Sequence, residues 1–354
     1  MSIFEETLAA IEAPDADAAR HAQLQLDALT KPRGSLGYLE EIVRRYAAIR
    51  HDAAAVFGRG AIAVFVADHG VAAAGVSAYP KAVTVEMLRN IGAGGAAISV
   101  LARRFGYELI VTDVGVETDT SATPFKGVRY RRVAHGTRNF LEGPAMTTAQ
   151  ARQAIEIVLE TARDAAGGGV TLLGIGEMGI ANSTPAAAIL AAVTGIEPAR
   201  LTGRGTGVDD LALAHKVELI ETALRLHRGS LDDGLSLLAS IGGLEIAAMT
   251  GVCLGAAAVS LPVVVDGFIA TAAAAAAEKI RPGIREHLIF SHRSAEGGHA
   301  LALQAMGVRA MLDLDMRLGE GTGAAIAMNV IESALALFHE MATFESAGVS
   351  EKIE

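Results

Sequence analysis

The sequence predicts an α/β protein: a three-layer α/β/α arrangement with a mostly parallel, Rossmann-like sheet and a small helical domain built from both termini. Two observations lead to this prediction. Short apolar runs repeatedly end in a Gly/Asp-rich loop and lead into an Ala-rich helix pattern, which is typical of a parallel sheet covered on both faces. Both ends of the chain, in contrast, have helical periodicity without intervening strands. The 354 residues, 51% of them hydrophobic, can bury a large core.

The first 50 residues predict three helices. The chain opens with an acidic amphipathic segment, a second helix is expected from about residue 15 to 29, and apolar residues from Leu39 to Ile49 have the spacing of a third. A turn-rich loop with two cations, KPRGSLG at residues 31–37, separates the last two.

Five apolar runs then predict the strands of the sheet: residues 61–67, 109–111, 170–173, 263–265 and 288–290. Each is followed by Gly or by polar residues, including Asp113, Asp266 and His292. Ligands of parallel sheets bind beyond the carboxyl ends of the strands, so we expect these polar residues to meet in one crevice.

A last helix pattern begins near Thr322 and is expected to pack against the amino-terminal helices. We therefore predict a large nucleotide-binding α/β domain at 51–318 and a discontinuous helical domain formed by 1–50 and 319–354. No linker is apparent, so one cut would not separate the two.

Composition excludes several functions. The net charge of −10, without a basic segment that carries aromatics, argues against nucleic-acid binding. A single cysteine, Cys253, and an amino terminus without a basic or apolar leader favour a cytoplasmic protein. Residues 246–265 form an uncharged run of membrane-spanning length, but its glycines, its proline and its VVVDG ending indicate a core helix followed by a core strand. No membrane span is expected.

The segment RLGEGTGA at residues 317–324 is where we expect the chemistry. Gly319 and Gly321 flank Glu320 and have no Cβ, so a small molecule can approach the backbone closely. The amino terminus of the following helix should favour the ionised carboxylate that a general base requires. The alternative is that Glu320 only complements the helix dipole.

The segment GIGEMG at residues 174–179 matches the dinucleotide motif G-x-G-x-x-G, so an NAD-dependent oxidoreductase is an alternative function. The second strand with a terminal acid that this motif requires is missing around residues 195–200. The following ANSTP segment, at a helix start, offers amides and hydroxyls to an anion. Ser183 or Thr184 could equally cap that helix before Pro185.

Other chemistries lack their motifs. Asp and His residues at the strand ends do not have metal-ligand spacing, so no metal is expected. Neither a G-x-S-x-G elbow nor a Walker loop occurs.

Six segments resemble one family, in its order: KPxGSLGxLE at residues 31–40, ADHGV at 67–71 with GVSAYP at 75–80, GEMGIAN at 176–182, LPVVVDGF at 261–268, SHxSAE at 291–296 and RLGEGTGA at 317–324. The sequence resembles nicotinate-nucleotide:dimethylbenzimidazole phosphoribosyltransferases. This resemblance implies transfer of the phosphoribosyl group of nicotinate mononucleotide to 5,6-dimethylbenzimidazole, giving α-ribazole 5′-phosphate and nicotinate for the nucleotide loop of cobalamin. It also implies a homodimer that needs neither metal nor cofactor.

The resemblance further implies residue roles. Glu320 matches the catalytic base. The expected nucleotide side comprises Glu177, Gly179, Asn182, Ser183, Thr184, Lys216, Asp266, Gly267 and Ser294. The aromatic base should lie against Tyr79, Met87 and Leu318; some relatives have Ser and Gln at the first two positions, so the preferred base stays open. A non-catalytic nucleotide-binding protein is the remaining alternative.

Overall fold

The structure is a computed structural model that describes residues 2–120, 123–205 and 207–350. Its centre is a seven-stranded sheet in the order β3-β2-β1-β4-β5-β6-β7, with every neighbouring pair parallel. The strands are β1 (Arg59–Ala67), β2 (Glu108–Gly115), β3 (Val128–Tyr130), β4 (Val170–Met178), β5 (Val263–Val265), β6 (Leu288–His292) and β7 (Ala310–Leu312). The predicted α/β class is confirmed.

All five predicted runs form strands, but β1, β2, β4 and β6 extend beyond the predicted ends. The strands at the two edges, β3 and β7, were not predicted. Each has only three residues, and none of these residues is fully buried. Arg129 interrupts β3, and β7 is an apolar but partly exposed run, Ala310–Leu312. Strand order reverses between β1 and β4, where doubly wound sheets open a crevice.

Two hydrophobic cores cover the two faces of the sheet. Alternate residues of β1 divide between them: Ala63 and Phe65 face one core, and Ile62 and Val64 face the other. The first core contains residues of α1 (Ile3–Ala9), α6 (Thr148–Gly167), α7 (Ser183–Thr194), α8 (Pro198–Leu201), α9 (Asp210–Leu226), α10 (Gly234–Ile241), α11 (Leu244–Ala257), α12 (Phe268–Ile280) and α13 (His299–Ala305). The second contains residues of α2 (Ala16–Ala28), α3 (Tyr38–Arg50), α4 (Val83–Ala93), α5 (Ala97–Phe105) and α14 (Thr322–Glu340).

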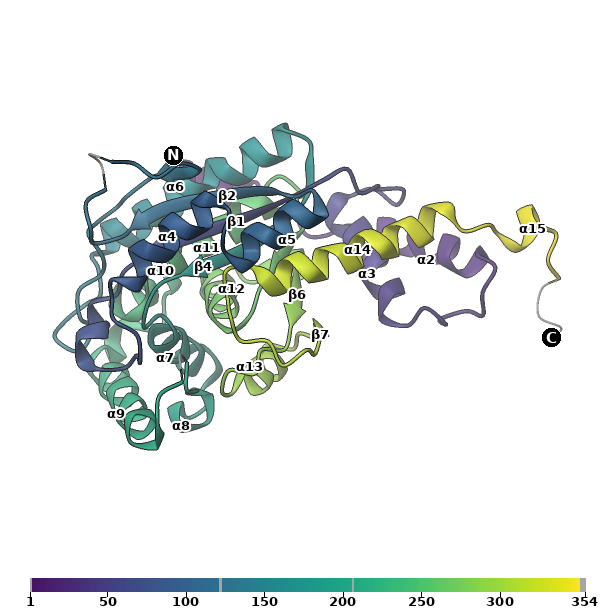
Figure 1. Ribbon diagram of the computed structural model, residues 1–354. Coiled ribbons are helices and arrows are strands. Elements are labelled where there is room, and N and C mark those ends of the chain that lie inside the picture. Colours follow the sequence, from purple (N-terminus) through teal and green to yellow (C-terminus); the bar gives the residue numbers. More distant parts are fainter. Residues whose placement is uncertain (1, 121–122, 206, 351–354) are drawn as a thin grey trace.

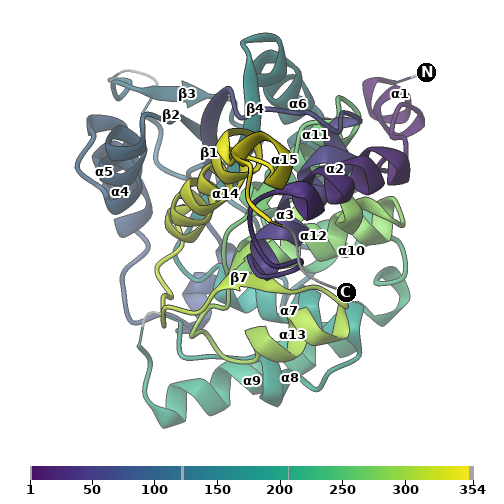
Figure 2. The same ribbon diagram turned by 90° about the vertical axis from the view of Figure 1, so that its right-hand side faces the viewer.

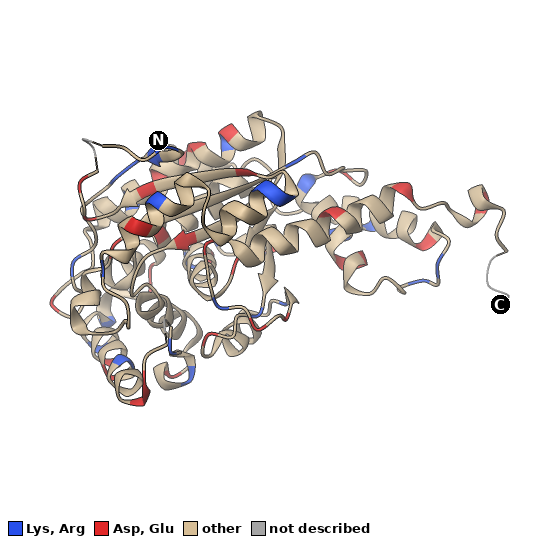
Figure 3. Cartoon of the chain, in the orientation of Figure 1, with Lys and Arg blue, Asp and Glu red and all other residues tan. Residues whose placement is uncertain are grey.

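Short helical segments complete the chain: α15 (Phe344–Ala347) and the 3-10 turns η1 (Gly70–Ala74), η2 (Arg228–Ser230) and η3 (Ile284–His287). The uncharged stretch at 246–265 is the buried helix α11 followed by β5, as predicted. Of the described helices, only α14 has the length and hydropathy to cross a membrane. This is weak evidence, because α14 packs on β4 and β6, and core helices pass the same test. Lys and Arg are interspersed with Asp and Glu in the view of Figure 3.

Helices from both ends of the chain lie side by side beyond the sheet. Figure 1 shows α2, α3 and the far half of α14 extending away from the strands, and this end faces the viewer in Figure 2. An antiparallel bridge joins Leu29 to Thr343. In the loop between α2 and α3, Lys31 forms a buried 2.8 Å ion pair with Glu40. In contrast, α1 packs against α6 and α11. The predicted domain boundaries stay a prediction, and residues 1 and 351–354 lie outside the described chain.

Candidate active site

A cavity of about 530 Å³ opens beyond the carboxyl ends of β4, β5 and β6. Its walls come from the loop after η1, the start of α4, the turn between β4 and α7, the segments that follow β5 and β6, and the segment before α14. Asp266 and His292 meet in this crevice, as their positions after the strands predicted, whereas Asp113 lies inside β2 and does not line it.

Most of the residues predicted for the site line this cavity: Tyr79, Met87, Glu177, Gly179, Asn182, Ser183, Asp266, Gly267, Ser294, Leu318 and Glu320. Thr184 and Lys216 do not. Lys216 is completely buried behind Ser183, and its Nζ donates to Ser183 Oγ at 2.8 Å and to the carbonyl oxygen of Gly203 at 3.2 Å. Burial lowers the pKa of Lys216 to about 8, against the opposing effect of Glu296.

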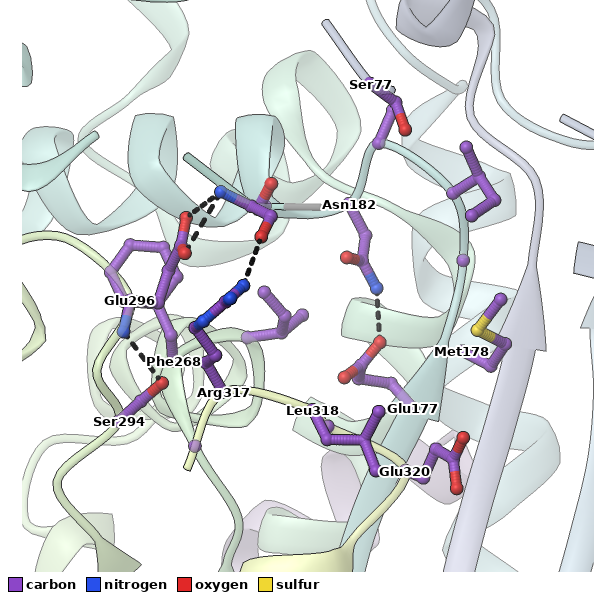
Figure 4. A pocket seen from close by; sticks show the side chains of 18 of the residues that line it. Ser77, Glu177, Met178, Asn182, Phe268, Ser294, Glu296, Arg317, Leu318 and Glu320 are labelled. Atoms are coloured by element: carbon purple, nitrogen blue, oxygen red, sulfur yellow. Dashed lines mark hydrogen bonds between the residues drawn. The ribbon is translucent and has the colours of Figure 1, made fainter. Parts of the chain in front are cut away.

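The helix α7 begins differently from the prediction. Asn182 is its N-cap residue, and Ser183 and Thr184 are its first two helical residues, so neither is the cap. The Asn182 side chain makes no cap bond; its Nδ2 donates to Glu177 Oε2 instead (Figure 4). The Thr184 hydroxyl is buried without a hydrogen-bond partner within the described chain.

Glu320 occupies a turn in which three consecutive residues have left-handed backbone angles. The φ values are 88° for Gly319, 61° for Glu320 and 88° for Gly321. Glycine adopts this conformation without penalty, whereas Glu320 is strained. The turn is held against β4 because the Glu320 amide donates to the carbonyl oxygen of Glu177 at 3.2 Å.

Within the described chain, the Glu320 carboxylate accepts no hydrogen bond from the first turn of its own helix. Its Oε2 accepts a 3.3 Å hydrogen bond from the amide of Ile98, in the first turn of α5. Desolvation by burial raises the pKa of Glu320, Asp266 adds to this rise, and the Ile98 amide opposes it. The ionised form is thus disfavoured overall, and the amide that supports it belongs to α5, not to the following helix as the sequence predicted.

Asp266 takes the position at the start of α14 instead. Its Oδ2 accepts from the amide of Gly321 at 3.2 Å, and its Oδ1 from that of Ala324 at 2.9 Å. The residue directly after β5 thus fixes the turn that carries Glu320. Burial outweighs these bonds and raises the pKa of Asp266 to about 7.

Glu177, at the end of β4, is the third acid in the cavity. Burial is the main reason that its pKa rises to about 8; Asn182 opposes the rise, while Glu245, Asp266 and Glu320 add to it. Since like charges in a buried site disfavour simultaneous ionisation, the three cavity acids do not all carry charge near neutral pH.

The three glycines of GIGEMG have packing roles. Gly174 and Gly176 lie inside β4, not in the turn after it. A Cβ on Gly176 would lie 2.2 Å from the amide nitrogen of Gly321, and one on Gly174 would lie 2.9 Å from Met328 Sδ of α14. One on Gly179 would lie 2.5 Å from the carbonyl oxygen of Ala67. The motif lets the Glu320 turn and α14 pack directly on the sheet, which removes the main argument for dinucleotide binding.

Several lining residues were not predicted for the crevice: Val76, Ser77, Val83, Met178, Ile180, Ala181, Gly205, Phe268, Ile269, Glu296 and Arg317. His292 was expected in the crevice, but without a role in binding. Arg317 Nη1 donates to the carbonyl oxygen of Gly205 at 3.3 Å, and both carboxylate oxygens of Glu296 accept from the Gly205 amide, at 2.8 and 3.0 Å (Figure 4). The family segments 291–296 and 317–324 contain His292, Glu296 and Arg317. Membership in these segments was a signal that could have identified the three as site residues. Within the described ranges, no three His, Cys, Asp or Glu side chains are grouped as metal ligands.

Comparison with known proteins gives consistent results. A family model described as phosphoribosyltransferase matches residues 11–349. The nicotinate-nucleotide–dimethylbenzimidazole phosphoribosyltransferases of Geobacter sp. strain M21 and Chloroflexus aggregans are 47% and 49% identical to this chain. These matches cover 99% and 100% of this chain, and 100% of each relative.

Solved structures agree with these sequence matches. The crystal structure of CobT from Thermus thermophilus has a TM-score of 0.90 and 44% identity, covering 95% of this chain and 100% of that one. A second crystal structure of the dimethylbenzimidazole phosphoribosyltransferase from the same organism has a TM-score of 0.89. Sequence and structure thus match over almost the entire length, and the chain belongs to the nicotinate-nucleotide–dimethylbenzimidazole phosphoribosyltransferase family.

Proposed function

We propose that this enzyme transfers the 5-phosphoribosyl group of nicotinate mononucleotide to 5,6-dimethylbenzimidazole or a related base, giving α-ribazole 5′-phosphate and nicotinate for cobalamin nucleotide-loop synthesis. The observation that carries the proposal is the end-to-end match, at 47–49% identity, to enzymes named for this reaction. The cavity offers a matching arrangement of polar and apolar walls.

The nucleotide phosphate binds at the start of α7. A helix amino terminus presents unpaired amides and a positive dipole end, which favour an anion. Lys216 supplies positive charge directly behind Ser183, and Arg317 lies on the same side of the cavity beside Gly205. Lys216 therefore acts through Ser183 and by its charge, because it does not line the cavity.

The aromatic base binds against Tyr79, Met87 and Leu318. Tyr79 and Leu318 are 55% and 58% exposed, so their apolar surfaces are available to a planar heterocycle at the cavity mouth. Glu320 follows Leu318 by two positions in the chain, and both residues line the cavity (Figure 4).

Glu320 acts as the general base. One carboxylate oxygen is held by Ile98, and Oε1 has no hydrogen-bond partner within the described chain. A ring nitrogen of the base attacks the ribose anomeric carbon with inversion while the bond to nicotinate breaks. The other ring nitrogen then becomes acidic and gives its proton to Glu320. A raised pKa improves Glu320 as a proton acceptor near neutral pH.

The leaving group needs no acid. Nicotinate departs from a cationic pyridinium, so breaking the glycosidic bond neutralises that charge without protonation. The carboxyl group of Asp266, with a pKa of about 7, is partly ionised near neutral pH and can then favour the positive charge that develops on the ribose, as carboxylates do in other glycosyl transfers.

We further propose a cytoplasmic homodimer. The single, buried Cys253 is compatible with a reducing compartment, and the dimer follows from the family resemblance. Sedimentation analysis tests the oligomeric state.

Product analysis tests the activity. The purified protein is incubated with nicotinate mononucleotide and one candidate base in each of several parallel reactions. The candidate bases are dimethylbenzimidazole, other benzimidazoles, adenine and phenols. We expect equal amounts of nicotinate and a phosphorylated α-riboside of the preferred base. A protein that binds the nucleotide but releases no nicotinate with any base would contradict the proposal. Thermal protection by NAD alone would favour the dinucleotide alternative.

A further inference from the structure

His292 is a cavity residue to which the reaction described above gives no role. It is the last residue of β6, its side chain is 1% exposed, and it lines the cavity together with Asp266 and Ser294. Its Nδ1 lies 3.0 Å from Ser291 Oγ and 3.8 Å from Asp266 Oδ1. Its Nε2 has no hydrogen-bond partner within the described chain.

The hydrogen bonds around Ser291 determine which nitrogen of His292 carries the proton. Ser291 Oγ lies 2.8 Å from the carbonyl oxygen of Asp266, which can only accept, so the single hydroxyl proton of Ser291 is used there. Ser291 Oγ must therefore accept from His292, which places a proton on Nδ1. The Asp266 carboxylate near Nδ1 favours the same arrangement.

Burial keeps the ring neutral, because it lowers the pKa of His292 to about 4. A neutral imidazole with its proton on Nδ1 has a lone pair on Nε2. This nitrogen can accept a hydrogen bond but cannot donate one.

Two glycines lock the ring in place. A Cβ on Gly323 would lie 2.0 Å from His292 Nδ1, and a Cβ on Gly267 would lie 3.0 Å from Cε1. The imidazole is therefore confined between the segment after β5 and the first turn of α14. Its lone pair has a fixed direction before any ligand arrives, which is the arrangement expected of a positioning group.

We propose that His292 Nε2 accepts a hydrogen bond from a ribose hydroxyl of the nucleotide substrate and so orients the anomeric carbon toward the incoming base. The inference rests on the proposed function, since it assigns a partner to the phosphoribosyl donor. A hydroxyl is the complementary group, because Nε2 needs a hydrogen-bond donor and the ribose hydroxyls are the donors that the nucleotide offers. A phosphate or carboxylate, which offers only acceptor oxygens, is not recognised by this nitrogen.

A substrate–variant cycle tests the contact. The His292→Asn side chain can still donate to Ser291 but has no acceptor at the ε position. Rates are measured with nicotinate mononucleotide and with its 2′-deoxy and 3′-deoxy forms, which distinguish the two hydroxyls. In the wild type, removing the contacted hydroxyl should lower kcat/KM about tenfold, the size of one good hydrogen bond. In His292→Asn the natural substrate should lose a similar factor, and removing the same hydroxyl should then change kcat/KM by less than about twofold.

A purely structural role would give a different result. Suppose that removing either hydroxyl lowers kcat/KM by the same factor in His292→Asn as in the wild type. The two effects are then additive, and the inference is wrong. His292→Gln is the matched variant, because its amide oxygen restores an acceptor near the ε position, and it should recover part of the lost activity.

The tautomer can be measured without turnover. Nitrogen NMR of the wild-type protein with labelled histidine, assigned with His292→Gln, should show the proton of His292 on Nδ1. A proton on Nε2 would overturn the inference even if the variants fold poorly. If the wild type releases no nicotinate, the proposed function fails, whereas additive cycles in an active enzyme reject only the role of His292.

Discussion

The main-chain amide of Glu320 donates a hydrogen bond to the main-chain oxygen of Glu177, with 3.2 Å between nitrogen and oxygen. The turn that carries the Glu320 carboxyl group therefore lies directly on the end of β4, the strand that carries Glu177. Gly176 makes this possible, since its Cα faces the Gly321 amide. The position of the proposed base is thus set by backbone contacts, and substitutions that disturb them should affect activity more than folding.

Gly176→Ala should displace the Glu320 turn. The new methyl group would lie 2.2 Å from the backbone nitrogen of Gly321, and backbone cannot rotate aside as a side chain can. We expect kcat to fall by two orders of magnitude or more, because small misplacements of a catalytic group are costly. Gly167→Ala is the control: it has open space at the end of α6 and should leave kcat unchanged. Wild-type kcat in Gly176→Ala would contradict the packing argument.

Glu177 should make the protein less stable as the pH rises. Its pKa is about 8 in the native state and near its ordinary value of 4.5 in the unfolded chain. Between these values the native state holds a proton that the unfolded state lacks, so the free energy of unfolding falls with increasing pH. Denaturant unfolding of Glu177→Gln should therefore show a larger gain, or a smaller loss, relative to wild type at pH 8 than at pH 5.

The exposed Glu86 on α4 supplies the matched control, as Glu86→Gln makes the same chemical change away from the cavity. Its difference from wild type should be the same at both pH values. A Glu177→Gln difference that is also independent of pH would exclude the raised pKa.

Lys216→Met should weaken binding of nicotinate mononucleotide and leave the KM of the base unchanged, because it removes the charge behind Ser183. With the pKa of Lys216 at about 8, raising the pH from 7 to 9 removes this charge in the wild type. The KM for the nucleotide should therefore rise over that range in the wild type and stay flatter in Lys216→Met. Lys279→Met is the control, because the Nζ of Lys279 donates only to the carbonyl oxygens of Leu231 and Asp232 among the described residues. An identical pH dependence in wild type and Lys216→Met would reject this role.

Tyr79→Ala should raise the KM for dimethylbenzimidazole several-fold, since aromatic contacts contribute about 0.5–1.5 kcal/mol beyond buried area. The KM for nicotinate mononucleotide should not change, because Tyr79 is assigned to the other side of the cavity. Leu211→Ala, at a residue that is 83% exposed and does not line the cavity, controls for loss of an exposed apolar side chain. A rise in the nucleotide KM alone would reverse the assignment of the two sides.

Much of the architecture was predictable because it depends on local patterns. The buried strands are continuous apolar runs, and the residues after β4, β5 and β6 meet because parallel strands end at one edge. The edge strands do not show such a pattern: β3 contains Arg129, and the three apolar residues of β7 are only partly buried, unlike those of the equally short β5. The position of the cavity could therefore be predicted from the order of the elements, even though the edge strands of the sheet could not.

The finer features depend on contacts between distant segments. Ile98 donates to Glu320 across 222 positions, so no local pattern could indicate that α5, and not α14, faces this carboxylate. The position of Lys216 behind Ser183 depends in the same way on how α9 packs against α7. The glycines of GIGEMG were misleading because close packing against a turn requires the same residues as close approach to a phosphate.

Glu320→Gln provides the most direct measurement of the central claim, that this side chain takes the proton from the attacking base. The variant keeps the size and the contact with Ile98 but cannot accept a proton. Release of nicotinate and formation of the α-riboside should fall by a factor of about 10²–10⁴. Calorimetric binding of nicotinate mononucleotide should remain close to that of the wild type. Near wild-type turnover by Glu320→Gln would contradict the account.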